Sequence, residues 1–365
     1  MKNGDEVGNS NAMIFADKRI LVTGGTGSLG KVLVRRLLSG KDGLPAKITV
    51  FSRDEAKQHF MRLEYQHKSA ATDEIIYNNF RQRLDFRIGD VRDYHSVAAA
   101  LQDIDIVFNA AALKQVPTCE YFPFEAVRTN IEGPENIVRV IQTQRLPVKT
   151  VIGISTDKAC KPVNAMGMTK ALQERVFIQA NMRCPGTRFI CARYGNVLAS
   201  RGSVIPLFHE QIRAGGPVTI TSPDMTRFLL SLDDAVDTIF AGVRDARVGE
   251  TYIPRVPSAL VTNVAKVLIA GRPIETRIVG IRPGEKIHEI LVSEEEAQRS
   301  IARGKYYVIL PMLPELGVSI NGDGCLKQEY SSADEVMDLQ ATTRMIEERR
   351  LTVPELSEEQ EEILG

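Results

Sequence analysis

The sequence predicts an α/β fold, in which a doubly wound parallel sheet is followed by a smaller C-terminal region. Three observations support this prediction. Short apolar segments alternate with helical patterns through the first two thirds of the 365-residue chain. The apolar segments are nearly continuous, which is typical of parallel strands buried on both faces. A glycine-rich turn directly follows the first of them.

The individual elements follow from these patterns in chain order. Six apolar segments are predicted to be buried strands, at residues 19–23, 47–51, 84–88, 105–109, 148–154 and 187–192. Five segments carry apolar residues three or four positions apart, which predicts helices. These segments are residues 28–39, 53–67, 93–101, 125–144 and 163–182.

The pattern changes after about Arg193, where glycine and proline become frequent and the elements become shorter. We expect this part to form a smaller, less regular unit over the carboxyl edge of the sheet. The predicted organisation is a flexible tail, a nucleotide-binding domain, a mainly substrate-binding region and a C-terminal extension. Their residues are 1–12, 13–192, 193–303 and 304–365, respectively.

Composition and charge exclude several classes of function. Basic and acidic residues number 46 each, so no net field favours nucleic acid or an anionic membrane as a partner. The five cysteines form no Cys-x-x-Cys pair and the five histidines show no metal-ligand spacing. We therefore expect neither a disulfide framework nor a metal site. No apolar run approaches the ~20 residues of a membrane span, and the polar N-terminus lacks a signal sequence, so a cytoplasmic protein is expected.

The glycine-rich turn predicts a dinucleotide site. It satisfies Gly-x-Gly-x-x-Gly and lies between a predicted strand and a predicted helix, the context that makes this motif informative. Glycines let the backbone approach a pyrophosphate, which then lies on the free amides of the helix start. The sheet is therefore predicted to be of the Rossmann type. The predicted cofactor-binding residues of the turn are Gly24, Gly25, Thr26, Gly27, Ser28, Leu29 and Gly30.

Residues after the next strands bear on which nicotinamide nucleotide binds. The second strand is followed by Ser52 and Arg53, where an acidic residue would bind a free ribose 2′-hydroxyl. A hydroxyl and a guanidinium suit a 2′-phosphate, so NADP is predicted in preference to NAD. Arg53 also fits the solvated first turn of a helix, and Asp54 would supply an acidic residue if the register shifted. Further cofactor contacts are predicted after the third and fourth strands, at Asp90, Val91, Ala110, Ala111 and Ala112.

The candidate catalytic residues lie at the end of a central predicted strand. Thr156, Asp157 and Lys158 follow the apolar segment 148–154, and open α/β sheets bind ligands at such strand ends. Met166 and Lys170 are four residues apart on one helix face. This spacing resembles the Tyr-x-x-x-Lys pair of short-chain dehydrogenases, with methionine in place of the tyrosine. The structural alternatives are a solvated charged turn and a methionine that only fills the core.

These motifs together resemble the extended short-chain dehydrogenase/reductases. More narrowly, they resemble the inverting UDP-N-acetylglucosamine 4,6-dehydratases of bacterial polysaccharide biosynthesis, over about residues 18–300. The resemblance is carried by the glycine-rich turn, Asn-Ala-Ala-Ala-Leu-Lys at 109–114, Ser-Thr-Asp-Lys at 155–158 and Arg-Pro-Gly-Glu-Lys at 282–286. Methionine at position 166 matches a subgroup of that family. The resemblance implies UDP-N-acetylglucosamine as substrate and a homo-oligomer formed through the helices at 125–144 and 163–182.

The resemblance also implies a reaction sequence. Hydride passes from sugar carbon 4 to NADP⁺, Lys158 removes the proton on carbon 5, and Asp157 helps the carbon 6 hydroxyl to leave as water. Hydride then returns to carbon 6, and carbon 5 is reprotonated on the opposite face. Lys158 must be neutral to act as this base, against an ordinary pKa of ~10.4. Burial and neighbouring positive charge favour the neutral amine, whereas Asp157 opposes it.

The resemblance assigns further residues to the site. Thr156 is implied to bind the sugar's 4-oxygen and Lys170 to hold the nicotinamide ribose. Without the tyrosine, the proton of the 4-hydroxyl is left to Asp157, to a water held by Thr156 or to Lys158, and we expect Asp157. Other implied cofactor contacts are Lys114, Asn130 and Tyr194. Implied substrate contacts are Lys114, Asn196, Arg201, Ser203, Val204, Arg227, Arg282 and Glu285.

Two other functions fit part of the pattern. A UDP-hexose 4-epimerase would use the same scaffold and hydride transfer at carbon 4, but would need no carbon 5 base. A non-catalytic NADP-binding regulatory protein would explain Met166, but not the retained charges of Asp157, Lys158 and Lys170. The mass of the product distinguishes the enzymes, because dehydration removes one water and epimerisation removes nothing.

Overall fold

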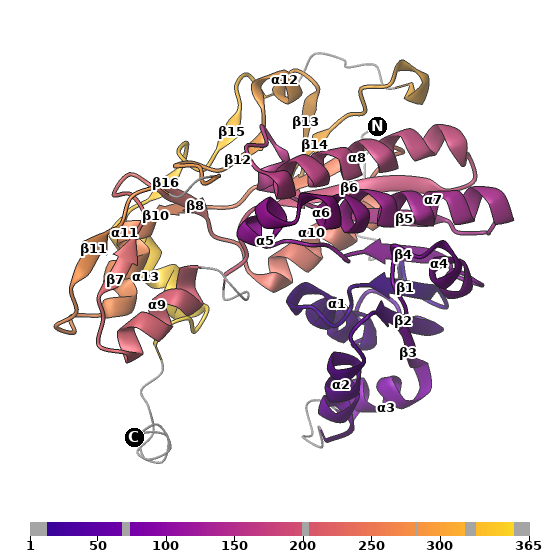
Figure 1. Ribbon diagram of the computed structural model, residues 1–365, viewed down its shortest axis with the longest axis horizontal. Coiled ribbons are helices and arrows are strands. Elements are labelled where there is room, and N and C mark those ends of the chain that lie inside the picture. Colours follow the sequence, from indigo (N-terminus) through magenta and orange to yellow (C-terminus); the bar gives the residue numbers. More distant parts are fainter. Residues whose placement is uncertain (1–12, 68–73, 199–203, 282–283, 318–325, 354–365) are drawn as a thin grey trace, which may run out of the picture.

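The centre of the protein is a nine-stranded sheet in the computed structural model (Figure 1). The structure describes residues 13–67, 74–198, 204–281, 284–317 and 326–353. The strand order is β13-β14-β9-β6-β5-β4-β1-β2-β3. The bounds of these strands are β1 Arg19–Thr23, β2 Lys47–Ser52, β3 Leu84–Ile88, β4 Ile106–Asn109, β5 Thr150–Thr156, β6 Arg188–Tyr194, β9 Thr251–Pro254, β13 Ser300–Arg303 and β14 Tyr306–Ile309.

The pairing of the strands confirms the predicted Rossmann-type parallel sheet. In this sheet, all neighbours from β3 to β9 pair in parallel, and β14 pairs antiparallel with β9 and with β13. Register aligns Thr23 with Asn109, and Thr156 with Tyr194. The carboxyl ends of the central strands therefore meet at one edge, which is where such sheets bind ligands.

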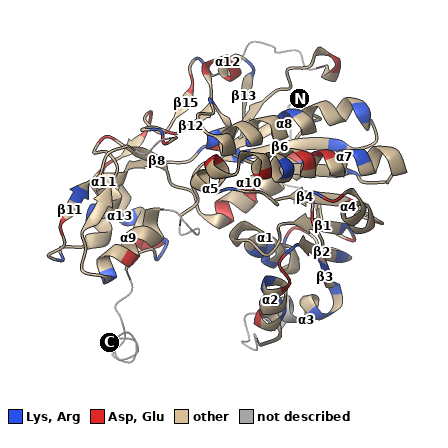
Figure 2. Cartoon of the chain, viewed as in Figure 1, with Lys and Arg blue, Asp and Glu red and all other residues tan. Residues whose placement is uncertain are grey.

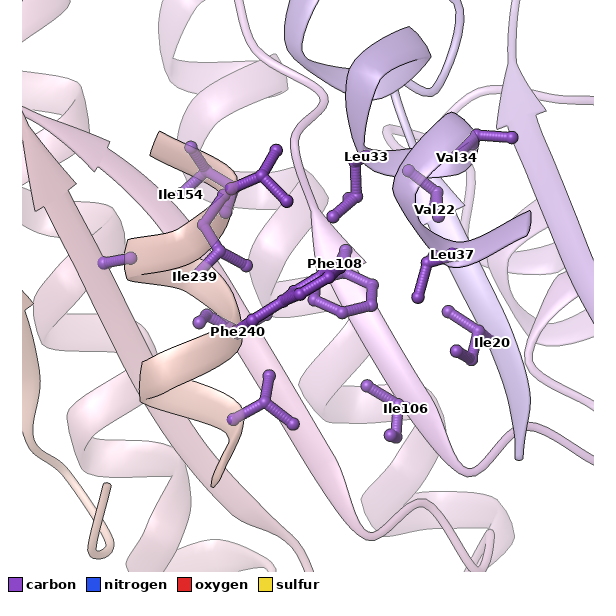
Figure 3. Close-up of a cluster of buried hydrophobic side chains, with 14 of the residues drawn as sticks. Ile20, Val22, Leu33, Val34, Leu37, Ile106, Phe108, Ile154, Ile239 and Phe240 are labelled. Carbon is purple, nitrogen blue, oxygen red and sulfur yellow. The ribbon is translucent and has the colours of Figure 1, made fainter. Parts of the chain in front are cut away.

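Helices cover both faces of the sheet, as a doubly wound fold requires. Apolar side chains of α1 and α10 pack on one face, and those of α4, α7 and α8 pack on the other. On the first face, the rings of Phe108 and Phe240 lie 6.3 Å apart at the centre of the cluster (Figure 3). The helices that belong to this part of the chain are α1 Ser28–Leu38, α2 Glu55–His67, α3 Glu74–Arg83, α4 Tyr94–Ala100, α5 Val116–Tyr121, α6 Pro123–Val127, α7 Gly133–Gln144, α8 Ala165–Arg183 and α10 Leu232–Asp245.

The structure differs from the predicted elements in a few places. β3 is the edge strand, and most of its residues are exposed or half-buried, so the expectation of a strand buried on both faces is wrong there. The predicted helix at 125–144 is divided into α6, a π-helical turn η2 at Arg128–Glu132, and α7. The short helices α3 and α5 were not predicted, because neither has a strong apolar stripe.

A smaller lobe lies beside the sheet (Figure 1). Its own apolar core joins α9, β7, α11 and α13. The expected extension from residue 304 divides between the two parts, since β14 belongs to the main sheet and α13 packs in the lobe. The remaining elements are η3 Asp157–Ala159, α9 Val204–Arg213, β7 Val218–Ile220, β8 Thr226–Phe228, β10 Ser258–Leu260, α11 Val261–Ile269, β11 Thr276–Ile278, β12 Ile290–Val292, α12 Glu294–Ala297, η4 Pro314–Leu316, β15 Tyr330–Ser331, β16 Val336–Met337 and α13 Leu339–Glu348.

Charged residues of both signs occur in both parts of the molecule (Figure 2). This distribution agrees with the zero formal net charge of the chain. None of the helices in the described residues combines the length and apolar character needed to cross a bilayer.

Candidate active site

The glycine-rich turn connects β1 to α1 at the carboxyl edge of the sheet. Gly24 has a φ of 67°, and a Cβ at this position would lie 2.7 Å from the backbone nitrogen of Ala111. Glycine is therefore required for both the turn and the close approach. α1 follows Gly27, and no side chain of the described residues caps the amides at its start. This cradle of backbone amides fits the pyrophosphate of a dinucleotide.

The residues predicted at the adenosine ribose lie together after β2 and β3. The Ser52 hydroxyl accepts a hydrogen bond from Gln58 at 3.0 Å. The guanidinium of Arg53 is half exposed and lies 3.7 Å from the Asp90 carboxylate. Burial raises the pKa of Asp90, but hydrogen bonds from Arg92 and the charge of Arg53 outweigh it, so the net pKa is lowered. Asp90 is thus an ionised anchor that holds two guanidinium groups.

The loop after β4 is fixed by the buried amide of Asn130. Its side chain accepts from the backbone nitrogen of Leu113 at 2.8 Å and donates to the Leu113 carbonyl at 2.9 Å. It also donates to the Thr169 hydroxyl at 3.0 Å. Asn130 belongs to the π-helical turn η2, a conformation that is frequent at functional sites. Both N–H groups of Asn130 are used within the chain, so this residue shapes the loop that includes Ala110, Ala111 and Ala112.

The predicted catalytic turn, at residues 156–158, lies between β5 and α8. The Thr156 hydroxyl caps η3 by accepting from the backbone nitrogen of Lys158, and it donates to Asp157 Oδ1 at 2.7 Å. The backbone of this turn packs directly against the start of α8. A Cβ on Gly167 would lie 2.1 Å from the Lys158 carbonyl oxygen. Glycine at this position therefore allows the turn and the helix to meet.

Three oxygen atoms surround the Lys158 amine. It donates to Asp157 Oδ1 at 3.1 Å, to Asn196 Oδ1 at 3.0 Å and to Glu289 Oε1 at 3.4 Å. An ammonium has three N–H groups, so these acceptors engage all of them. Burial lowers the pKa of Lys158, but the two carboxylates outweigh burial and the nearby charge of Arg227, and the net pKa is raised. The balance that the sequence left open therefore favours a charged amine.

Two carboxylate oxygens beside this amine remain unpaired. Asp157 is fully buried, and among the described residues nothing donates to its Oδ2. The same holds for Oε2 of Glu289, whose side chain is almost fully buried. A buried acceptor without a donor is costly, and such groups in native proteins often belong to functional sites. The pair of free oxygens is the feature of this cluster that can receive hydroxyl groups or protons.

Lys170 and Met166 are both almost fully buried. The Lys170 amine donates to the Ile154 carbonyl of β5 and to Gln173 Oε1 of α8. Burial lowers the pKa of Lys170 to about 8, against smaller opposing effects of Cys191 and Glu174. Met166 is 5 % exposed and packs in an apolar cluster with Cys119 and Ala126. Its thioether thus fills space within this cluster.

The predicted substrate residues are only partly brought together. Asn196 reaches Lys158, whereas Val204 packs partly against the core of the smaller lobe. Arg227 donates to the carbonyls of Lys286 and Ile287 and lies 3.7 Å from Glu289. Tyr194 is buried in the main core, and burial raises the pKa of its phenol. Lys114 and Glu285 each interact with another residue. Arg201, Ser203 and Arg282 lie outside the described residues.

Sequence reasoning missed three buried acidic residues. One is Glu289, and the other two, Glu174 and Glu296, form an ion-pair network with Arg193. In that network Arg193 donates to Glu174 at 2.7 Å and to Glu296 at 2.7 Å. Ser155 also donates to Glu174. The only available signal for Glu289 was its position three residues after Lys286 in a charged stretch.

Comparison with known proteins places the chain in a family. The model of the polysaccharide biosynthesis protein family matches residues 20–311. The chain belongs to this family, whose matched region contains both the glycine-rich turn and the catalytic turn. Among solved structures, Pen from Bacillus thuringiensis has a TM-score of 0.81 and 32 % identity, and the match covers 93 % of this chain and 99 % of that one.

More distant structures share the fold. DesIV, a dTDP-glucose 4,6-dehydratase from Streptomyces venezuelae with NAD bound, has a TM-score of 0.61 at 22 % identity. That match covers 74 % of this chain and 86 % of the other. The fold is thus the one found in nicotinamide-dependent sugar-nucleotide epimerases and dehydratases.

Curated relatives correct the predicted reaction. The chain is 46 % identical over 301 residues to the UDP-glucose 4-epimerase of Rickettsia prowazekii, with 81 % of this chain and 84 % of that one covered. It is 45 % identical to the UDP-glucose 4-epimerase of Rickettsia typhi over the same shares of each chain. The expectation of a 4,6-dehydratase is therefore wrong, and the relatives support the epimerase that the sequence left as an alternative. The motif at 156–158 misled because its residue types do not fix which proton is removed.

Proposed function

We propose that this protein is a nicotinamide-dependent UDP-sugar 4-epimerase. The reaction inverts carbon 4 of the hexose through a 4-ketone, and its substrate and product have the same mass. The observation that carries the proposal is the fully engaged ammonium of Lys158, which has no lone pair for a proton on carbon 5. The epimerases of Rickettsia, at 45–46 % identity, support the same reaction.

Asp157 is the proposed acceptor for the proton of the 4-hydroxyl. Its Oδ1 is held by Thr156 and Lys158, whereas Oδ2 has no donor among the described residues. The free oxygen takes the proton as the C4–H bond breaks, and it returns the proton to the new hydroxyl after the ketone has presented its other face. A positioned general base of this kind accelerates a reaction by ~10²–10⁴. Met166 cannot take this part, because a thioether accepts no proton at neutral pH.

Lys158 supplies positive charge to the same step. Its ammonium lies beside Asp157, so it stabilises the negative charge that develops on the 4-oxygen when the proton leaves. The nicotinamide nucleotide, when bound in the glycine-rich cradle, takes the hydride from carbon 4 and gives it back, so no net oxidant is consumed. Asn196 shares the ammonium with Asp157 and thereby links the loop after β6 to the reacting centre.

NADP is the proposed form of the cofactor. Support comes from Arg53, which is half exposed at the end of β2 and close enough to Asp90 to be oriented by it. A guanidinium at this position binds a 2′-phosphate, whereas NAD-binding proteins place an acidic residue there. The distant structural neighbour DesIV contains NAD, so the two nucleotides have to be compared directly.

A homo-oligomer formed through α7 and α8 is also proposed. Support comes from Met168, Leu172 and Met182 on α8, each of which is about half exposed. Apolar side chains gathered on one helix favour a protein partner. Light scattering of the purified protein measures the assembly, and Leu172→Glu is expected to shift it toward monomer.

The test of the proposed function is an incubation with UDP-glucose and, separately, with UDP-N-acetylglucosamine in deuterated water. We expect a product of unchanged mass in which carbon 4 is inverted and carbon 5 carries no deuterium, as read by NMR and mass spectrometry. Loss of one water or deuterium at carbon 5 would contradict the epimerase. A protein that binds the cofactor but converts neither sugar would indicate the non-catalytic alternative.

A further inference from the structure

Glu289 joins the catalytic cluster from a distant part of the chain. It lies directly before β12, 131 positions after Lys158, and its Oε1 is 3.4 Å from the Lys158 amine. Its side chain is 4 % exposed. Oε1 also lies 3.7 Å from Arg227, and Oε2 has no donor among the described residues. A carboxylate buried at this depth needs a compensating interaction, and Lys158 supplies the shortest one.

The C-terminal part of the chain holds Glu289 in place. Its backbone nitrogen donates to the Ser332 hydroxyl at 2.9 Å, and the Ser332 nitrogen donates to the Glu289 carbonyl at 2.8 Å. The Ser332 hydroxyl is in turn 2.7 Å from the Thr226 hydroxyl, which is 2.8 Å from His288. β12 pairs antiparallel with β15, which ends one residue before Ser332. Glu289 is therefore fixed at both its backbone groups.

The charges around Lys158 come from three elements. Asp157 of η3 and Glu289 at the start of β12 are negative, and Arg227 of β8 is positive and opposes them. With Glu289 removed, one carboxylate and one guanidinium would remain near the amine. The ammonium would lose its contact with Glu289, and its charge would be less stabilised.

We propose that Glu289 is a positioning residue that holds the Lys158 ammonium beside Asp157, and that Ser332 serves the active site by fixing Glu289. Glu289 acts through Lys158 on the proton transfer at the sugar's 4-hydroxyl. The catalytic part of this inference rests on the proposed function, whereas the effect of Glu289 on the charge of Lys158 does not. The C-terminal segment at residues 326–332 thus belongs functionally to the site formed at residues 156–158.

The test measures Lys158 itself as well as turnover. The variants are Glu289→Gln, which removes the charge, Glu289→Asp, which keeps it, and Ser332→Ala, which removes the hydroxyl that accepts from the Glu289 backbone nitrogen. Glu294→Gln is the matched control, because it removes an exposed carboxylate from the same stretch. At pH 9 each protein is acetylated with acetic anhydride, and the rate at Lys158 is read by peptide mass spectrometry relative to the exposed Lys305.

We expect Glu289→Gln to speed acetylation of Lys158 by about 10-fold or more. Loss of a neighbouring opposite charge lowers the pKa of an amine by about one or more, which raises the reactive neutral fraction by the same factor. We expect kcat to fall by up to ~100-fold, with loss of activity beginning at lower pH. Glu289→Asp should lie between wild type and Glu289→Gln in both readouts. Glu294→Gln should match wild type.

The outcomes separate the two proposals. Wild-type acetylation in a folded Glu289→Gln protein would overturn the positioning role, even if kcat fell. Faster acetylation in a protein that converts no UDP-sugar would uphold the role of Glu289 and contradict the epimerase. If Glu289→Gln does not fold, Ser332→Ala and Glu289→Asp decide, and wild-type values of both readouts in both variants would overturn the inference.

Discussion

Lys158 and Glu289 are 131 positions apart in the chain, and the amine of the one lies 3.4 Å from the carboxylate of the other. This contact changes the chemistry available to Lys158. Burial lowers the pKa of the Lys158 amine, and Asp157 opposes this effect. With Glu289 as a second carboxylate beside it, the amine is held charged. A charged amine stabilises an anion and does not abstract a carbon-bound proton. The contact therefore connects the arrangement of the C-terminal region to the choice between epimerisation and elimination.

Asp157→Asn tests the proton acceptor. The amide oxygen can still accept from Thr156 and Lys158, so the turn should keep its geometry. We expect kcat to fall by ~10²–10⁴ because the free oxygen can no longer take a proton. The measurement is the absorbance of reduced nicotinamide in a single turnover. An unchanged rate of the first hydride transfer would show that Asp157 is not the acceptor, and an unchanged affinity for UDP-sugar serves as the control.

Met166→Tyr tests whether the methionine site can still accommodate a catalytic tyrosine. Met166 is almost fully buried against Cys119 and Ala126, and a larger ring would overfill this cluster. We expect the free energy of unfolding to fall by about 1–3 kcal/mol and kcat not to rise. Met168→Tyr is the matched control, because Met168 is half exposed on the same helix and should tolerate the ring. A variant with higher kcat and wild-type stability would contradict the assignment of proton transfer to Asp157.

The sequence predicted what local patterns determine. Near-continuous apolar segments placed the first six strands within one or two residues, because burial on both faces leaves a strong signal. The glycine-rich turn and the cluster at 156–158 were found because their residues are adjacent in the chain. Edge position was not predictable, and β3 therefore differed from the expectation.

The charge state of Lys158 was not predictable for a different reason. It depends on Glu289 and Arg227, which reach the amine only through the pairing of β12 with β15 and of β8 with β10. The segment that carries Ser332 is polar and weakly patterned, so nothing in its sequence indicated a contact with the site. The predicted elimination reaction required a neutral Lys158. The charge state of Lys158 is set by its three-dimensional surroundings and not by the motif.

Arg53→Ala tests the preference for NADP. The guanidinium lies at the end of β2 and is oriented toward Asp90. A charge-assisted hydrogen bond of about 1.5–3 kcal/mol to a 2′-phosphate corresponds to ~10–100-fold in affinity. We expect the Kd for NADP to rise by this factor and the Kd for NAD to stay near its wild-type value, as measured by calorimetry. Lys57→Ala is the control, since this exposed lysine lies one turn further along. Equal losses for both nucleotides would contradict the proposed preference.

Lys170→Met tests the burial of a second lysine through the pH dependence of stability. Burial lowers the pKa of Lys170 to about 8 from an ordinary value of 10.5. Between these values the unfolded chain binds a proton that the folded chain does not, so this group makes the free energy of unfolding rise with pH. The rise amounts to up to ~3 kcal/mol across the window. In this pH window Lys158 adds no pH dependence to the free energy of unfolding. Its pKa is raised, so its contribution to stability is lost only above pH 10.5.

Denaturant unfolding of wild type and Lys170→Met at pH values from about 7.5 to 10.5 measures this effect. The difference between the two curves removes the titration of all other groups. We expect wild type to gain stability relative to the variant as pH rises through about 8, and Lys158→Met to retain the wild-type slope. Parallel curves for wild type and Lys170→Met would show that the amine stays protonated in the folded protein. The Lys170 amine would then be a permanent buried cation. Its contacts with Ile154 and Gln173 would have to stabilise a full charge.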